Sequence, residues 1–225
     1  MAKKLKIIFG VGVPLGLLMA VLKNALNIED DRFWRYYAIG AAIAIFGAIL
    51  INLFYQLRLV KKLKAVTNHA KENQDYDLLI REMEQMLATY KGKYSRSLFK
   101  MNICYALAKK KQYAEGLELL NSLDVKTVKG LNKLIFYLNQ VYFYFYLDNL
   151  DEVIRINQEW GREFAKFEEH PQLGEHVAAN RVYLAVAQGQ LEQAWDLLAE
   201  AERKWTDRGA QEEQRLLKEK LGSER

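Results

Sequence analysis

The side chains best suited to chemistry in this 225-residue chain are few and widely separated. The single cysteine, Cys104, has no histidine near it in the sequence and occupies a small, apolar position, so we expect an inert packing residue rather than a nucleophile. The three histidines are too few and too scattered to suggest a metal site. The carboxylates have the spacing of solvated helix faces, with basic residues at compatible turns. We therefore predict no catalytic residue, no metal site and no cofactor.

One combination of residue types that suits binding recurs along the chain. It occurs at Asn102-x-x-Tyr105, Asn139-x-x-Tyr142 and Asn180-x-x-Tyr183. An asparagine can donate to and accept from a peptide backbone, and a tyrosine offers a large rigid face with a polar tip. The repetition fits two interpretations. The residues form a row along a binding groove, or the asparagines bridge neighbouring helices while the tyrosines fill the gaps between repeats.

The elements that would position these residues are helix pairs with a short turn between their members. Four segments have the composition of such a turn, and their last residues lie 37, 37 and 41 positions apart. The segments are Gln74-Asp75-Tyr76, Lys111-Gln112-Tyr113, Asp148-Asn149-Leu150 and Gly189-Gln190-Leu191. Each Asn-x-x-Tyr begins 11 residues before the end of one of the last three segments. After Lys61 the chain has one proline and no sustained alternation, so we predict stacked helix pairs. The predicted turns fall near Asp75, Gln112, Asn149 and Gln190.

The stretch from Asn102 to Leu120 resembles a tetratricopeptide repeat, a family in which paired helices touch at two small residues. Here those positions are Cys104 and Gly116. Residues 189–194 are similar to the family's turn between helices, although the repeats here exceed the family's period of about 34 residues and lack its closing proline. The resemblance implies an all-α fold, with a solenoid of about four helix pairs over residues 61–209 and a charged capping helix over residues 210–225. Another helix-hairpin family with the same architecture is the alternative.

The resemblance also implies where a partner binds. In tetratricopeptide domains the first helix of each repeat lines a concave groove that holds partner peptides. The corresponding residues here are Asn102, Tyr105, Lys109, Asn139, Tyr142, Tyr146, Asn180 and Tyr183. A run of aromatic residues between Phe136 and Tyr146 offers a second candidate surface, because rings on a helix that point in all directions cannot all face one core.

Two apolar stretches near the N-terminus predict a transmembrane hairpin in residues 1–60. The second stretch, residues 36–54, would span about 28 Å as a helix, close to the ~30 Å hydrocarbon core of a bilayer. The first stretch, residues 7–22, is shorter, and a cleaved signal peptide is the alternative there. We favour a retained helix because no clear cleavage site follows and a second span comes immediately.

Small residues recur at four-residue spacing in both stretches and suggest how the hairpin would close. They are Gly12 and Gly16 in the first stretch, and Gly40, Ala44 and Ala48 in the second. Such residues let two helices approach closely in lipid. The alternative is that glycine is simply frequent in membrane helices.

The distribution of charge predicts orientation and partners. Basic residues precede the first stretch and follow the second, which favours a membrane protein with both termini and the repeat domain in the cytoplasm. Residues 61–225 hold 26 basic and 25 acidic groups, so we expect no nucleic-acid partner. The expected function is that of a non-enzymatic scaffold or adaptor in the cell membrane that binds a protein or peptide. The alternative is a regulatory or assembly subunit of a membrane complex, such as a transporter or envelope machinery, whose hairpin makes the main contacts or oligomerises.

Overall fold

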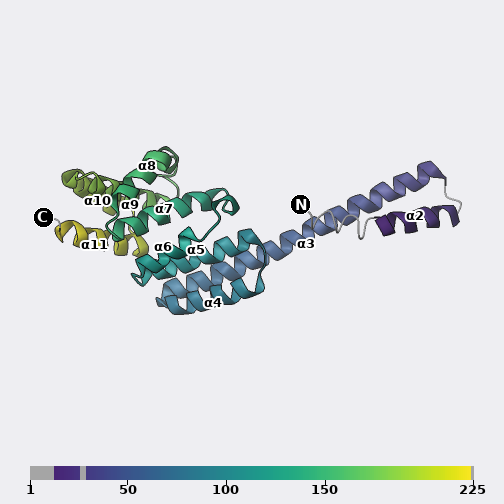
Figure 1. Cartoon of the computed structure of the whole chain (residues 1–225), viewed down its shortest axis with the longest axis horizontal. Coiled ribbons are helices and arrows are strands. Elements are labelled where there is room, and N and C mark those ends of the chain that lie inside the picture. The colour runs from purple at the N-terminus through teal and green to yellow at the C-terminus, as the bar shows by residue number, and fades with distance from the viewer. Residues whose placement is uncertain (1–12, 26–28, 224–225) are drawn as a thin grey trace. The chain divides into compact units, whose positions relative to one another are not determined.

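The computed structural model describes residues 13–25 and 29–223, and the regular structure in this part of the chain is helical, without strands (Figure 1). This confirms the predicted all-α class. The chain divides into two compact units, Met1–Lys64 and Ala65–Arg225.

The first unit contains α2 (Val13–Ala25) and most of α3 (Asp30–Asn73), whose last residues belong to the second unit. Within the described residues, α3 alone is long and apolar enough, by length and composition, to cross a membrane. Its apolar side chains are uncovered: Ile43, Phe46 and Phe54 expose 67 %, 63 % and 63 % of their surface. The predicted span 36–54 lies inside α3, whereas residues 7–12 of the other predicted span lie outside the described residues.

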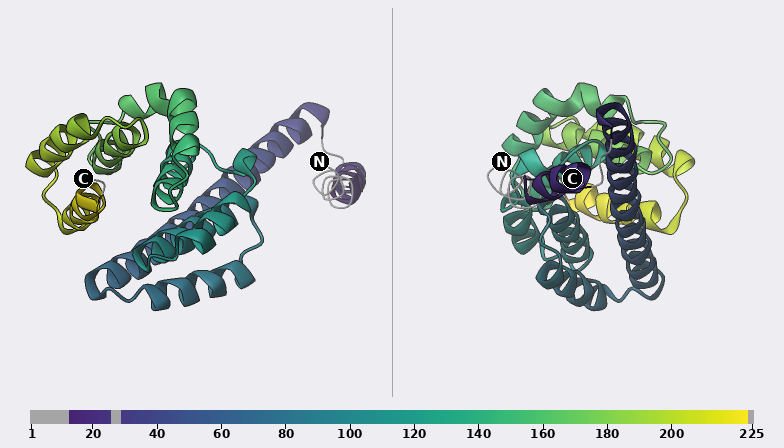
Figure 2. Two further views of the ribbon diagram at one scale, coloured as in Figure 1. Left: turned by 60° about the vertical axis from the view of Figure 1, so that its left-hand side comes forward. Right: turned by 90° about the vertical axis from the view of Figure 1, so that its right-hand side faces the viewer.

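The second unit is a series of helices in which each helix from α4 onward packs on the next. After the end of α3, the elements are α4 (Tyr76–Thr89), α5 (Lys93–Lys109), α6 (Tyr113–Asn121), the short 3-10 helix η2 (Val125–Thr127), α7 (Leu131–Tyr146), α8 (Leu150–Ala165), α9 (Gly174–Ala187), α10 (Leu191–Lys204) and α11 (Arg208–Ser223). The odd-numbered helices also contact one another, α5 with α7, α7 with α9, and α9 with α11 (Figures 1 and 2). These helices therefore share one side of the unit.

Four turns of one geometry join α3 to α4, α5 to α6, α7 to α8 and α9 to α10. In each, a residue with positive φ precedes the residue that caps the next helix. These residues are Gln74, Lys111, Asp148 and Gly189, with φ of 56°, 59°, 56° and 71°. The N–H of each following cap residue donates to the carbonyl five positions earlier, at Ala70, Leu107, Tyr144 and Ala185. This hydrogen bond and the left-handed residue are the features of a Schellman motif, which ends a helix sharply. The caps are the four residues at which the sequence predicts turns.

The left-handed conformation yields a first prediction. Only one of the four positions holds glycine, and a residue with a Cβ pays about 1 kcal/mol for this conformation. Because Lys111 is exposed, Lys111→Gly is expected to raise the free energy of unfolding by about 1 kcal/mol. Gly189→Ala should lower it by a similar amount. Urea unfolding of the full chain in detergent micelles, followed by circular dichroism, measures both, and a destabilised Lys111→Gly variant would contradict the assignment.

The core of the second unit begins with the contact between α5 and α6. Cys104 is fully buried, and its Sγ lies 3.5 Å from the carbonyl oxygen of Gly116. The ring of Phe143 on α7 covers this contact so closely that a Cβ added at Gly116 would lie 2.5 Å from it. Cys104 and Gly116 are thus the small residues of a close helix contact, as predicted.

A second core cluster joins α7 to α11. Phe145, Val177 and Leu198 are buried in it, and so are Leu217 and Leu221 of α11, each 1 % exposed. The C-terminal helix is therefore part of the core of this unit.

Candidate binding groove

A cavity of about 550 Å³ lies in the second unit, on the side shared by the odd-numbered helices. One wall consists of residues from the end of α3 and from α5, α7 and α9, and the other consists largely of α11 and the segment before it. Cavities of about 300–1,000 Å³ are typical of sites that hold small molecules or single peptide side chains. The cavity is therefore large enough for ligand recognition.

Four tyrosines form a connected group at one end of this cavity, which we call the groove. Two of them, Tyr142 and Tyr183, line it. Tyr142 and Tyr146 lie one helical turn apart on α7, and their ring centroids are 4.8 Å apart. Tyr113 at the start of α6 stacks on Tyr146 at 4.8 Å, with 16° between the ring planes. Tyr183 on α9 lies 6.3 Å from Tyr142, edge to face. These aromatic contacts fix the positions of the hydroxyl groups.

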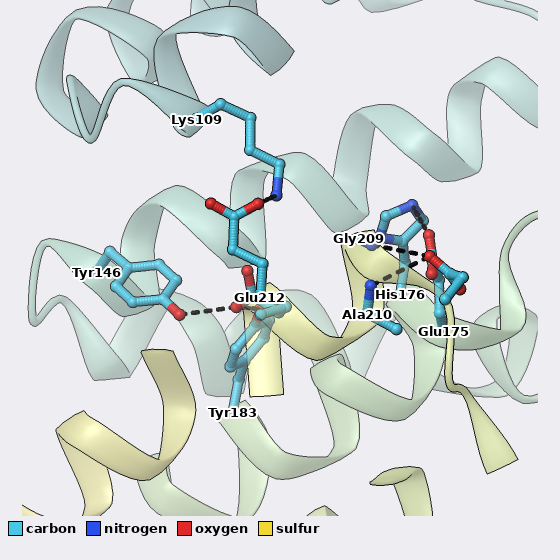
Figure 3. Close-up of polar contacts among 10 residues, drawn as sticks. Lys109, Tyr146, Glu175, His176, Tyr183, Gly209, Ala210 and Glu212 are labelled. Atoms are coloured by element: carbon cyan, nitrogen blue, oxygen red, sulfur yellow. Dashed lines mark hydrogen bonds and ion pairs between the residues drawn. The ribbon is translucent and has the colours of Figure 1, made fainter. Parts of the chain in front are cut away.

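The hydroxyl groups of this cluster meet a carboxylate of α11. Oε1 of Glu213 accepts hydrogen bonds from Tyr146 at 2.7 Å and Tyr183 at 2.5 Å, and the adjacent Glu212 forms a 2.8 Å ion pair with Lys109 of α5 (Figure 3). Burial raises the pKa of Glu213, while the two hydroxyl donors and Lys109 oppose this. Burial, followed by the charge of Glu213, raises the pKa of Tyr146. The hydroxyl groups therefore act as donors at neutral pH.

At the other end of the groove, carboxyl groups of α9 and of the α10–α11 connection meet. Asp207 accepts the N–H groups of Gly209 at 2.9 Å and Ala210 at 3.3 Å, and so caps α11 (Figure 3). Burial, and then a hydrogen bond to Asp207 and its charge, raise the pKa of Glu175 to about 7. Glu175 is therefore protonated below that pH, whereas the pKa of Asp207 is lowered.

His176 adjoins this carboxyl pair. Its Nε2 is 3.2 Å from Oε1 of Glu175, and His176 lines the cavity. Burial, and then the charges of Lys71 and Lys109, lower the pKa of His176, and the 55 % exposure of its side chain limits the effect of burial. The imidazole is therefore neutral at physiological pH.

The structure brings five of the eight predicted groove residues to the wall of this one cavity. They are Tyr105, Lys109, Asn139, Tyr142 and Tyr183. Tyr146 adjoins the cavity through its hydrogen bond to Glu213. On the aromatic run, Phe143 and Phe145 are buried, with 1 % and 0 % exposure.

The three repeated asparagines have three different environments. Asn139 lies on the cavity wall. Asn102 donates to the carbonyl of Leu98 at 2.8 Å and accepts from Thr67 of α3 at 3.2 Å. Asn180 is 3 % exposed and exchanges two hydrogen bonds with Asn157 of α8, at 2.7 and 3.2 Å. Asn102 and Asn180 thus connect helices and do not line the cavity.

The buried amide pair yields a second prediction. Asn180→Ala removes both hydrogen bonds and leaves the amide of Asn157 partly unsatisfied in the core, which costs about 2 kcal/mol. Asn139→Ala is the matched control, and we expect it to change stability by less than about 0.5 kcal/mol. Thermal and urea unfolding of the two full-length variants measure this difference. Equal effects at the two positions would contradict it.

In the part of the chain that the structure describes, the small residues predicted to pack within the hairpin make no close contact. Gly12 lies outside this part, and a Cβ added at Gly16 or at Gly40 would meet no atom within 4 Å. Ala44 and Ala48 are exposed on α3. Contact of these residues within a hairpin stays a prediction.

The acidic side of the groove is not apparent from the sequence. Glu212 and Glu213 lie in a stretch that reads as a charged helix, and Glu175 and Asp207 lie in unrelated segments. One signal was available. Ala210, Gln214, Leu217 and Leu221 follow a spacing of four, three and four, which is a helix face that packs.

In the described ranges, the thiol of Cys104 and the possible metal-binding side chains show no arrangement suited to catalysis. Burial raises the pKa of the Cys104 thiol to about 12, so the thiolate is scarce at neutral pH. Among the described residues, no three His, Cys, Asp or Glu side chains gather closely enough to hold a metal ion.

The chain matches no protein-family profile, no curated protein sequence and no solved structure. The geometry of the groove is therefore the basis for inferring function.

Proposed function

We propose that this protein is a membrane-anchored interaction module whose second unit, a tetratricopeptide-like solenoid, binds a protein or peptide partner in the groove. The solenoid interpretation is supported by four equivalent turns at the predicted repeat positions and by helices that each pack on the next. The helix α3, which is long and apolar enough to cross a membrane, supports the anchor. The basic residues on both flanks of the apolar stretches support a cytoplasmic location for the groove.

The observation that carries the proposal is the convergence of the predicted groove residues on one cavity. They come from three different helices, α5, α7 and α9, at positions that the resemblance implies. Tyrosine, lysine and asparagine side chains on the wall of a partly apolar cavity are typical of a site that holds a peptide. The thiol on the cavity wall, Cys104, has its pKa raised to about 12 by burial and is protonated at neutral pH, so binding is the better-supported activity.

The proposal is tested by charging the groove without disturbing the core. Asn139→Lys places a long cationic side chain in the cavity, whereas Gln140→Lys places the same side chain at the next position of α7, which is not on the cavity wall. Both tagged proteins are purified from native membranes in mild detergent, and co-purifying proteins are quantified by mass spectrometry. We expect a partner that is retained by the wild type and Gln140→Lys and reduced at least tenfold by Asn139→Lys. Equal retention by the two variants would reject the groove as the binding site.

The alternative is a subunit that contacts a membrane complex mainly through its apolar N-terminal segment. The observation that favours it is the uncovered apolar surface of α3, which is available to lipid or to another helix. Replacing residues 36–54 with a polyleucine span of equal length separates the two functions. A partner held by the groove stays bound to the chimera, and a partner held by the hairpin is lost.

A further inference from the structure

The C-terminal helix α11 occupies the groove in the manner of a bound amphipathic helix. Its buried residues Ala210, Gln214, Leu217 and Leu221 form one stripe, with exposures of 5 %, 7 %, 1 % and 1 %. Leu217 and Leu221 pack into the cluster built by α7, α9 and α10. α11 contacts α10 and α9, and its side chains also reach Lys109 of α5 and Tyr146 of α7. Its contacts therefore extend beyond the last helix pair.

The polar contacts of α11 extend across the helices that wall the groove. Its carboxylates pair with Lys109 of α5, Tyr146 of α7 and Tyr183 of α9, and its Lys220 pairs with Asp148 after α7 at 2.5 Å. Lys109, Tyr146 and Tyr183 are three of the eight residues that the resemblance assigns to a partner-binding groove. At these contacts the groove supplies the hydrogen-bond donors and α11 supplies the acceptors. The bound helix therefore displays the chemistry that this site recognises.

α11 leaves much of the groove unfilled. The cavity of about 550 Å³ lies beside its first turns, where it presents the small residue Ala210. Atoms that face an empty space lose dispersion contacts on that side. A helix with a larger side chain at this position would gain contacts that α11 does not make.

The attachment of α11 allows such an exchange. Only residues 205–207 separate it from α10, and they are non-helical. The ring of Trp205 anchors one side of this connection, since a Cβ added at Gly174 would lie 2.3 Å from it. Rotation about the residues that follow Trp205 would release the helix while the connection stays attached.

We infer that α11 is an internal ligand of the groove, and that the partner presents an acidic amphipathic helix that binds by displacing α11. This inference rests on the proposed function, because it names the partner class and the regulation of the same site. The two helices compete, so the affinity for the partner is reduced by the fraction of molecules in which α11 occupies the groove. A tethered helix is present at an effective concentration in the millimolar range, so only a helix that fits better, or a weakened α11, permits binding.

The test uses α11 itself as the probe. A fluorescein-labelled peptide of residues 207–225 is titrated into the full-length protein in detergent micelles, and binding is measured by fluorescence anisotropy. Glu213→Lys places an ammonium group against the hydroxyl groups of Tyr146 and Tyr183 and weakens the seating of the tethered helix. We expect Glu213→Lys to bind the peptide at least tenfold more tightly than the wild type. Glu219→Lys reverses a charge on the exposed side of α11, where Glu219 pairs with Arg215, and should bind as the wild type does.

A charge exchange tests the register of the probe. Adding Lys109→Glu to Glu213→Lys should weaken peptide binding at least fivefold, because Lys109 faces Glu212. A peptide that carries Glu212→Lys should recover this loss on the double variant only. Recovery assigns the probe to the position of α11, and absence of recovery would overturn the assignment.

A second measurement covers the case in which Glu213→Lys impairs folding. Spin labels at Gln211 on α11 and Gln158 on α8, both exposed positions, report the seating of α11 in the otherwise unchanged chain. Excess peptide should broaden their distance distribution. A distribution that does not change, together with no binding to the milder variant Glu213→Gln, overturns the inference. Failure of the Asn139→Lys co-purification test alone would reject the proposed function and leave the peptide result standing, so the two failures are distinguishable.

Discussion

Replacing Gly116 with valine is expected to destabilise the second unit by about 3 kcal/mol or more. The ring of Phe143 lies where a side chain at this position would begin, with its Cε1 and Cζ 2.5 Å from an added Cβ. Phe143 is 1 % exposed and packs in a cluster with Leu120, Val128 and Phe136, so displacing the ring disturbs these contacts. Overpacking of a filled core costs about 1–3 kcal/mol, and more when the neighbours cannot move.

A graded series with a matched control tests this expectation. Gly116→Ala adds one methyl group and should cost about 2 kcal/mol, less than valine. Gly161→Ala adds the same group in the interior of α8, where a Cβ would meet no atom within 4 Å, and should raise stability by about 0.5–1 kcal/mol through helix propensity. Shortening the ring with Phe143→Leu in the Gly116→Ala background should recover part of the loss, as expected for residues in contact. Urea unfolding of the full chain measures the series, and additive effects at Gly116 and Phe143 would contradict the argument.

The sequence predicted the turns and the close contact at Gly116 because both depend on local features. Each turn needs one left-handed residue and one cap within two adjacent positions, and these recur with the repeat at Lys111-Gln112 and Gly189-Gln190. The touching residues Cys104 and Gly116 are only 12 positions apart. Short separations such as these leave a visible pattern in a single sequence.

The position of α11 could not be predicted in the same way. Its ion pair between Lys109 and Glu212 joins residues 103 positions apart, and its hydrogen bond from Tyr146 joins residues 67 positions apart. Its buried stripe includes Gln214, whose amide donates to the carbonyl of Trp205 at 2.9 Å, so the stripe does not read as apolar. The sequence therefore predicted a helix over residues 210–225, close to the observed Arg208–Ser223, but not its contacts with α5 and α7.

The repeated asparagines show why a regular pattern did not define the groove. Asn102, Asn139 and Asn180 occupy equivalent positions, but the environment of each depends on the helix that faces it. Thr67 faces the first, the cavity borders the second, and Asn157 faces the third. An amide accepts any of these environments because it both donates and accepts hydrogen bonds. The facing residue is not part of the repeated pattern, so the pattern alone does not separate packing from binding.

The second large effect is a dependence of stability on pH that originates at Glu175. Its folded pKa of about 7 lies above the ordinary value of 4.5, so the folded state binds more protons than the unfolded state between these values. Its contribution is therefore fully present below pH 4.5 and is lost as the pH rises through 7. The shift corresponds to about 3 kcal/mol. The groups around it are Asp207 before α11, Lys71 on α3, Lys109 on α5 and the adjacent His176.

The neighbours of Glu175 modify this dependence in predictable ways. Asp207 has a lowered pKa despite burial, because Glu175 and backbone N–H groups donate to it. Its titration therefore changes stability only below about pH 4. His176, with its pKa lowered from 6.5 to about 4, favours the folded state increasingly as the pH rises from 4 to 6.5. Its ring is 55 % exposed, so water screens this opposing contribution and Glu175 dominates.

We therefore expect the free energy of unfolding of the full chain to fall by up to about 3 kcal/mol between pH 4.5 and 7.5, and Glu175→Gln to remove most of that fall. Burial also raises the pKa of Glu213, so its titration lowers the stability of the wild type and of Glu175→Gln equally as the pH rises. The difference between the two stability curves therefore isolates Glu175. His176→Gln should make the fall steeper, because it removes the opposing contribution. Urea midpoints at half-unit pH intervals measure the three curves, with Glu219→Gln as a control for the loss of one carboxylate. Superimposable curves for the wild type and Glu175→Gln would show that the folded state does not raise the pKa of Glu175.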